Sequence, residues 1–163
     1  MSLHLLPPQP LTSDHQLDDF ACGETDLDEW LKRRALVNQI NGASRTFVVA
    51  DADHHVFGYY SLASGAVARK TATGKVRRNM PEPIPVMVLG RLAVDRRVQG
   101  MQCGAALLKD AVERTMAVSK NVGVRALLVH ALNDSARGFY QHFGFQESPI
   151  DRMTLMLRLE DAP

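Results

Sequence analysis

The sequence predicts one α/β (or α+β) domain over residues 1–163, with parallel strand pairing in its second half. A length of 163 residues suits a single domain of about 100–200 residues. The chain is 45% hydrophobic and 23% charged, which is close to the average for soluble globular domains. In the second half, segments rich in β-forming residues alternate with helical segments, and this order is typical of parallel pairing.

Composition excludes several other classes of protein. No apolar run reaches the roughly 18–20 residues of a transmembrane helix. The first eight residues lack the basic start and long apolar core of a secretory signal. Two cysteines, Cys22 and Cys103, are too few for a disulfide framework. We therefore expect a cytoplasmic protein with no membrane contact.

The first half predicts a helix followed by a β-hairpin. Residues 3–6 predict a short opening strand that ends at two prolines. Residues 26–38 have helical apolar spacing, with Asp26 as the expected N-cap and Asn41-Gly42 as the stop. Residues 45–50 and 56–66 are rich in β-formers and flank a turn, so we expect them to pair.

The second half predicts alternating strands and helices after a long loop. The loop has no hydrophobic period and contains Gly74 and three prolines. The sequence predicts a loop at residues 69–85, a strand at 86–94 and a helix at 104–116. It then predicts a strand at 125–131, a short helix at 135–143 and a closing strand at 153–159.

Charge is distributed unevenly, although the formal net charge is only +1. Residues 14–29 contain seven acids and no lysine or arginine, whereas residues 32–78 contain nine basic residues and only two acids. A basic face attracts polyanions such as nucleic acids. A solvated surface stretch would have the same composition, so charge alone leaves both readings open.

Residues 88–108 predict a strand, a basic turn, a glycine-containing loop and a helix start. Such a loop aims backbone N–H groups at one point, and the helix N-terminus adds positive potential. A pyrophosphate would fit there, and Arg96 and Arg97 could neutralise further phosphate charge. The loop matches neither a Walker loop nor a dinucleotide fingerprint. An ordinary strand-to-helix turn is the alternative.

A second motif follows at residues 133–145, with Asn133-x-x-Ala136, then Phe139-Tyr140 and Gly144-Phe145. Taken alone, Tyr140 could be one more aromatic of a packed cluster. Together the two motifs resemble the GNAT superfamily of acyl-CoA-dependent N-acetyltransferases. The loop 99–104 departs from that family at Gln102, where glycine is usual; we expect its side chain in solvent and its backbone in an ordinary helical or β conformation.

The resemblance implies a GNAT fold: a central mixed, twisted sheet with helices on both faces and a splay between two parallel strands, ending at Val94 and Ala131. Acetyl-CoA would lie in the splay, with one backbone N–H polarising the thioester carbonyl. Tyr140 would protonate the leaving thiolate as general acid. The residues implied to hold acetyl-CoA are Leu92, Ala93, Val94, Gln99, Gly100, Met101, Gln102, Cys103, Gly104, Ala105, Asn133 and Ser135.

A narrower resemblance is carried by Phe20-x-Cys22-Gly23-x-x-x-Leu27-Asp28-x-Trp30-Leu31, by Arg34-Ala35, and by residues 42–49, 59–63 and 89–95. They look like the GNAT toxins of bacterial toxin–antitoxin modules. This implies acetylation of the α-amino group of aminoacyl-tRNA, inhibition by a ribbon-helix-helix antitoxin, and a homodimer. The basic stretch agrees, and the stretch and the resemblance together suggest an RNA-binding set of Arg45, Arg69, Lys70, Lys75, Arg77, Arg78 and Arg91.

The chemistry favours an α-amine substrate. An α-amino group has a reference pKa of about 7.7–8.0, so part of it is neutral at pH 7 and no carboxylate base is needed, whereas lysine titrates near 10.4. Cys103 lies in the phosphate loop, so it more simply fills a small apolar slot than acts as a nucleophile. The six histidines show no metal-ligand spacing, and we predict no metal.

Two alternatives remain open from the sequence. The protein could be a GNAT enzyme for a small amine or a protein N-terminus, with the basic stretch only a soluble surface. It could also be a catalytically silent CoA-binding module whose phosphate loop is spoiled by Gln102. The preferred amino acid or tRNA is not encoded in any motif of the sequence.

Overall fold

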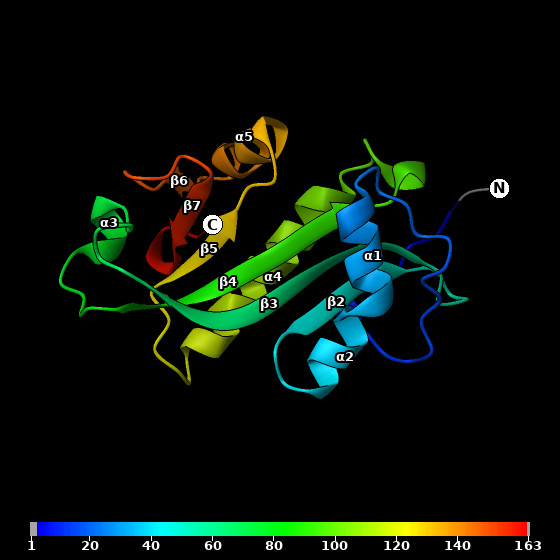
Figure 1. Cartoon of the computed structure of the whole chain (residues 1–163). Helices are drawn as coiled ribbons and strands as arrows, with labels where there is room; N and C mark the ends of the chain where they lie inside the picture. The colour runs from blue at the N-terminus through cyan, green and yellow to red at the C-terminus, as the bar shows by residue number, and fades with distance from the viewer. Residues whose placement is uncertain (1–2, 163) are drawn as a thin grey trace. The chain divides into compact units, whose positions relative to one another are not determined.

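A computed structural model describes residues 3–162 (Figure 1). They fold into two compact units. Unit 1 comprises Met1–Ala63 and Arg91–Ala111, and unit 2 comprises Ser64–Gly90 and Val112–Pro163. The strands are hydrogen-bonded in the order β1-β2-β3-β4-β5-β7-β6, a mixed seven-stranded sheet. Within the described chain, no helix combines the length and apolar character needed to cross a bilayer.

Unit 1 contains the predicted hairpin. Strands β2 (Arg45–Ala50) and β3 (Val56–Val67) pair antiparallel, from Arg45↔Leu62 to Ala50↔Val56. The strand predicted at residues 3–6 is wrong. The edge strand is β1 (Gln9–Pro10), while Leu6 only donates its N–H to the Ala50 carbonyl at 2.8 Å. The two prolines that follow Leu6 have no N–H, so they interrupt the pairing.

The helix predicted at residues 26–38 is two helices, α1 (Thr25–Arg33) and α2 (Ala35–Ile40). They part at Arg34, whose φ is −118°. The apolar spacing concealed this break because Leu31 and Ala35 stay four residues apart, and both are buried. Asp26 is not the N-cap: Glu24 holds that position, so the carboxylate of Asp26 lies in the first turn, where the helix dipole favours it.

Both faces of the unit 1 sheet are covered, as predicted. Helices α1 and α2 lie along one face of the β2–β3 hairpin, where Tyr59 donates its hydroxyl to the Leu27 carbonyl at 2.7 Å (Figure 1). Helix α4 (Cys103–Ser119) begins on the opposite face, where the Tyr60 hydroxyl donates to Asp110. Neighbouring strand residues point to opposite faces, so this tyrosine pair anchors one helix on each side.

Unit 2 contains the parallel pairing that the sequence predicts. Strand β4 (Ile84–Val94) pairs parallel with β5 (Ala126–His130), which pairs antiparallel with β7 (Thr154–Arg158). The short β6 (Gln146–Glu147) was not predicted. Helix α5 (Asp134–His142) matches the predicted short helix, and Gly144 follows it at φ 94°.

The predicted loop 69–85 needs a correction. It contains a one-turn helix, α3 (Gly74–Arg77), and β4 begins inside it at Ile84. The Thr73 hydroxyl caps α3 by accepting the Val76 N–H at 3.3 Å. Val76 is buried in a cluster with Ile84 and Val86, so a single apolar residue docks the turn. One apolar residue gives no period, which is why the pattern predicted only a loop.

Candidate active site

Strand β4 outruns its parallel partner. Pairing with β5 runs from Val86↔Ala126 to Leu89↔Val129, and β4 continues to Val94. Among the described residues, no β4–β5 ladder pair follows Leu89. The backbone of Leu92, Ala93 and Val94 can therefore pair with an extended ligand, as a strand would.

Asp95 anchors the turn that follows β4. Its side chain is 1% exposed and accepts the Ala21 N–H at 3.0 Å and the Arg97 N–H at 2.8 Å. The Arg97 guanidinium binds the same carboxylate through Nε and Nη2 at 2.8 and 2.9 Å, and lies 4.4 Å from the Phe57 ring centroid. Arg97 is thus paired with Asp95 inside unit 1, and its role beside a phosphate stays a prediction.

The glycine-containing loop is closed by Gln99. Its side-chain amide donates to the Cys22 and Val94 carbonyls at 2.8 and 2.9 Å. Gly100 and Gln102 both have left-handed backbones, with φ 84° and 62°. The expectation of an ordinary helical or β backbone at Gln102 was therefore wrong, whereas its side chain is exposed as predicted. The loop keeps a glycine-like conformation at Gln102, although such strain costs about 1–3 kcal/mol.

Cys103 fills a small buried slot at the start of α4. Its Sγ lies 3.2 Å from the point where a Cβ on Gly58 would stand, and Leu107 lies 3.0 Å from that point, so Gly58 makes room for both. Burial raises the pKa of the Cys103 thiol. A thiol held protonated is a poor nucleophile, so the slot-filling interpretation holds over the covalent one.

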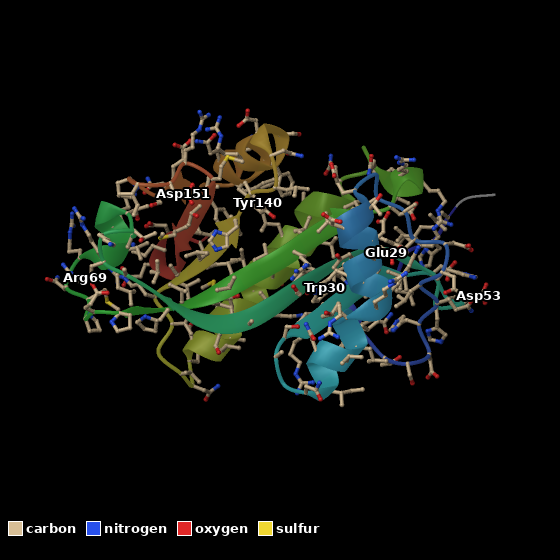
Figure 2. The ribbon with its side chains drawn as sticks, viewed as in Figure 1. Glu29, Trp30, Asp53, Arg69, Tyr140 and Asp151 are labelled. Atoms are coloured by element: carbon tan, nitrogen blue, oxygen red, sulfur yellow. The ribbon has the colours of Figure 1, made fainter. Side chains whose placement is uncertain are left out.

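In unit 2, α5 presents Tyr140 (Figure 2). Asn133 caps this helix by accepting the Ala136 N–H at 2.9 Å. Tyr140 is 7% exposed and contacts the rings of Phe139 and Phe145, and none of the described residues hydrogen-bonds its hydroxyl. Burial raises the pKa of Tyr140 to about 12. The hydroxyl is therefore protonated at neutral pH, as a general acid must be.

Some of the basic residues predicted to bind RNA contact other residues of this chain, and the others are exposed. Arg91 and Arg69 are partly buried: the Arg91 guanidinium lies 4.3 Å over the Trp30 ring, and Arg69 donates to backbone carbonyls. Lys75 lies 3.9 Å from Asp161. The remaining four are exposed: Arg45, Lys70, Arg77 and Arg78.

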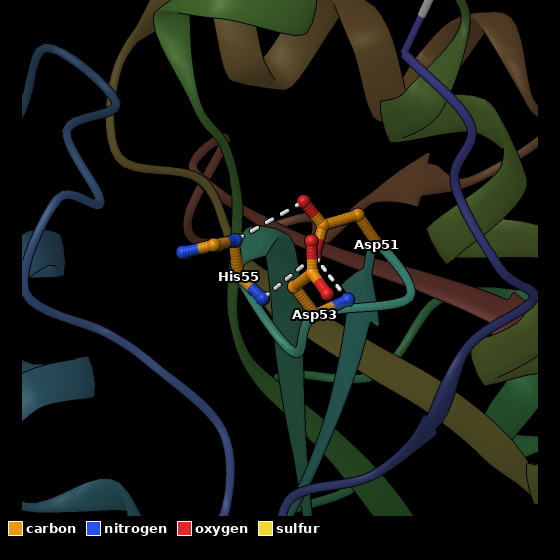
Figure 3. A group of neighbouring side chains, drawn as sticks. All are labelled: Asp51, Asp53 and His55. Carbon is orange, nitrogen blue, oxygen red and sulfur yellow. Dashed lines mark hydrogen bonds and ion pairs between the residues drawn. The ribbon is translucent and has the colours of Figure 1, made fainter.

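Two further features lie outside the predicted sites. A shallow hollow of about 660 Å³ in unit 2 is lined by Thr73, Arg77, Gln141 and Glu147 among others, but not by Tyr140. Asp51, Asp53 and His55 gather at the β2–β3 turn (Figure 3). There the Asp51 carboxylate accepts the N–H groups of Asp53 and His55 at 3.0 and 2.9 Å, so it is explained by the turn itself.

The contacts of Asp95 were not predicted from the sequence, and neither were those of Arg125, whose guanidinium donates to the Lys75 carbonyl at 2.8 Å. The sequence contains one indication for Asp95: it directly follows an apolar strand, and an arginine follows two residues later, so the two could form an ion pair. Arg125 has no local signal, because the carbonyls that it binds are up to 50 residues away in the chain.

We expect that Gln102→Gly changes acetyl-CoA affinity by less than about tenfold, or ~1.4 kcal/mol. The natural loop already holds the left-handed backbone that glycine adopts freely, and the side chain is exposed. Calorimetric titration of both proteins with acetyl-CoA measures this. Binding by the glycine variant alone would mean that the natural loop is spoiled and that the protein is a silent module.

Known proteins share this fold and sequence. The model for the acetyltransferase (GNAT) domain matches residues 43–147. The chain is 49% identical to the tRNA-acetylating toxin of Mycobacterium tuberculosis (strain ATCC 25618 / H37Rv) over 155 residues, which are 95% of this chain and 93% of the toxin.

Two solved structures are also similar. AtaT complexed with acetyl-methionyl-tRNAfMet has a TM-score of 0.89 and 30% identity, and the match covers 96% of both chains. A tyrosine-to-phenylalanine mutant of AtaT, bound to the C-terminus of the antitoxin AtaR and acetyl-CoA, has a TM-score of 0.83 and 28% identity, with 96% of this chain and 94% of that chain covered.

Proposed function

Because the chain belongs to the GNAT acetyltransferase family, it is an acetyl-CoA-dependent N-acetyltransferase, and we propose that its acceptor is the α-amino group of aminoacyl-tRNA. The observation that carries this proposal is 49% identity to a tRNA-acetylating toxin over 95% of the chain. The likeness to AtaT in complex with acetyl-methionyl-tRNAfMet supports it. We also propose that both units serve one acetyltransferase domain, since the match 43–147 draws on both.

In unit 1, the residues fit a CoA pyrophosphate. The loop from Gln99 to Ala105 keeps left-handed backbones at Gly100 and Gln102, and its side chains at these positions are absent or exposed. Its N–H groups and the start of α4 would hold the phosphates. The free edge of β4 at Leu92, Ala93 and Val94 would pair with the pantetheine arm, and one N–H would polarise the thioester carbonyl.

In unit 2, Asn133 and Ser135 are exposed at the start of α5, where they would hydrogen-bond the cosubstrate. Tyr140 supplies the proton. The acceptor amine forms a bond to the acetyl carbon, the carbon–sulfur bond breaks, and the thiolate takes the hydroxyl proton of Tyr140. Before attack the ammonium form of the acceptor loses one proton to solvent, since its pKa of about 7.7–8.0 needs no strong base. After attack the nitrogen releases a second proton to solvent, and the Tyr140 phenolate takes one proton back from solvent.

The same relatives also suggest a biological role and a protein partner. We propose that the protein is the translation-blocking toxin of a type II module, held inactive by a ribbon-helix-helix antitoxin encoded nearby. AtaT bound to the C-terminus of the antitoxin AtaR supports a protein antitoxin as partner. We also propose a homodimer. We propose a cytoplasmic location, because charged tRNA is a cytoplasmic substrate.

The deciding experiment offers labelled acetyl-CoA and four acceptors: charged tRNA, uncharged tRNA, an aminoacyl ester and a peptide N-terminus. We expect label on charged tRNA, released with the amino acid by mild base. Label on the peptide or on small amines, with none on charged tRNA, would favour the small-amine enzyme instead. No label on any acceptor would favour the silent module.

We expect Arg77→Ala with Arg78→Ala to weaken tRNA binding and flatten its salt dependence. Both side chains are exposed in unit 2. Each lost phosphate contact should reduce the slope of log affinity against log salt by about 0.9 on duplex. Filter binding at several salt concentrations measures this, and activity on an aminoacyl ester should stay unchanged. Equal losses with tRNA and ester would mean that these arginines support the fold.

A further inference from the structure

Two arginines tie down residues 69–83, which we name the basic loop. The first is Arg69 at its start. The Arg69 guanidinium donates to the Arg77 carbonyl at 2.9 Å and to the Met80 carbonyl, which closes the loop on itself. The Arg69 N–H donates to the Glu82 carboxylate at 3.0 Å. The charge of Arg69 is therefore used inside the loop.

The second arginine reaches the basic loop from the sheet. Arg125 precedes β5, and its own N–H donates to the Pro85 carbonyl at 2.9 Å. Its Nε donates to the Val76 carbonyl at 3.0 Å, and its Nη2 donates to the Lys75 and Arg78 carbonyls at 2.8 and 3.4 Å. Glu160 lies 3.5 Å from its Nη1. The side chain is only 16% exposed, so it has little surface for a macromolecule to touch.

The two guanidinium groups together bind five carbonyls of α3 and the residues after it: those of Lys75, Val76, Arg77, Arg78 and Met80. The Arg77 carbonyl also accepts the Met80 N–H at 3.1 Å, and a helix of one turn leaves most of its carbonyls to partners outside the helix. A guanidinium is planar and carries five donors in a fixed fork, so it fixes the direction of several carbonyls at once. The buried Val76 side chain holds the same turn against the sheet.

The consequence is a fixed outward display of charge. The cationic side chains of Lys70, Arg77 and Arg78 are exposed, and none has an ion pair with another residue between 3 and 162. Their backbone is already ordered by Arg69 and Arg125. Binding of a polyanion to such a loop loses less conformational freedom than binding to a mobile one.

We propose that Arg125 is a positioning residue for RNA binding: by holding the carbonyls of the basic loop, it presents Lys70, Arg77 and Arg78 to the phosphates of the tRNA. This inference rests on the proposed function and extends it to a residue that itself touches no substrate. Arg69 holds the basic loop in the same way, through the Arg77 and Met80 carbonyls.

The test compares Arg125→Gln and Arg125→Lys with the wild type, and uses Arg33→Gln as control. Arg33 is an exposed arginine on α1, paired with Glu29 at 2.7 Å and remote in sequence from the loop. For Arg125→Gln we expect a KM for aminoacyl-tRNA raised about tenfold, kcat within twofold, and a shallower salt slope for binding of uncharged tRNA. Turnover of an aminoacyl ester and acetyl-CoA affinity should not change.

The lysine variant separates positioning from direct contact. Lysine keeps the charge but lacks the planar fork that spans three carbonyls. A positioning role predicts that Arg125→Lys keeps most of the KM defect, whereas direct phosphate contact predicts full recovery. Hydrogen exchange should be faster at Val76–Met80 in Arg125→Gln, and Arg69→Gln should give the same KM defect if Arg125→Gln fails to fold.

The outcomes are distinct. An unchanged KM for aminoacyl-tRNA in folded Arg125→Gln overturns the inference, and so do equal losses with tRNA and ester. Full recovery in Arg125→Lys overturns it too. If the wild type acetylates the ester but not charged tRNA, the proposed function is overturned instead. In that case the inference is tested by binding alone: it is overturned if Arg125→Gln binds uncharged tRNA as well as the wild type does.

Discussion

Tyr140→Phe is expected to lower kcat for acetyl transfer by about 10²–10⁴-fold, the usual cost of losing a general acid. A tyrosine with an ordinary pKa of about 10 is already protonated at neutral pH, and burial raises the pKa of Tyr140 to about 12, so the proton is present before the reaction. The substitution removes one oxygen and keeps the ring contacts with Phe139 and Phe145. Steady-state kinetics with charged tRNA measure the loss.

Acetyl-CoA binding should survive in this variant, because the change removes no part of the phosphate loop. Calorimetry tests that. Tyr59→Phe is the matched control: it deletes another buried hydroxyl, one that donates to the Leu27 carbonyl at 2.7 Å, and we expect lower stability with near-normal kcat. Wild-type turnover by Tyr140→Phe would leave Tyr140 as a member of the aromatic cluster only.

The sequence predicted most elements because their signals are local. Strands β2 and β3 were predicted almost to the residue, since β-branched and aromatic residues flank a turn. The ends of α5 were also predicted within one residue, and the structure shows Asn133 as its cap and a left-handed Gly144 after it. These features depend on neighbours in the chain, which a sequence displays directly.

What the sequence could not predict depends on contacts that are distant in the chain or on backbone geometry. The break at Arg34 leaves the helical apolar spacing intact, so the pattern shows no sign of it. The left-handed Gln102 defies the usual preference for glycine, which a prediction based on preference cannot anticipate. The hydrogen bonds from the Arg125 guanidinium reach carbonyls up to 50 positions away in the chain, and no residue near Arg125 indicates these partners.

The site was accessible to sequence reasoning mainly through the family resemblance. Tyr140 and the loop 99–105 were chosen by motif, and the structure adds their geometry: a tyrosine packed between Phe139 and Phe145, and a glycine-like loop. The basic residues were chosen by composition. Composition could not separate Arg69, which faces backbone carbonyls, from Arg77 and Arg78, which face solvent.

Asp95→Ala is expected to lower the free energy of unfolding by about 2–4 kcal/mol at pH 7. The substitution leaves the Ala21 N–H and the Arg97 guanidinium without their acceptor, and each was within 3.0 Å of it. The glycine-containing loop begins four residues later, so acetyl-CoA affinity should fall as well. Asp95→Asn keeps one acceptor oxygen and should cost less. Denaturant unfolding, with the exposed Asp18→Ala as control, measures the differences.

The same carboxylate predicts a pH dependence. Burial alone would raise the pKa of Asp95, but the hydrogen bonds from Arg97 and from the Ala21 N–H together hold it below its usual value. A carboxylate whose folded pKa is depressed stabilises the fold above its unfolded pKa, about 3.9, and loses that stabilisation as pH falls through the folded pKa. The stability gap between wild type and Asp95→Ala should therefore be constant from pH 8 to about pH 5 and shrink below about pH 4. A gap that stays constant down to pH 3 would show that the charge of Asp95 contributes nothing and that its loss acts only through packing.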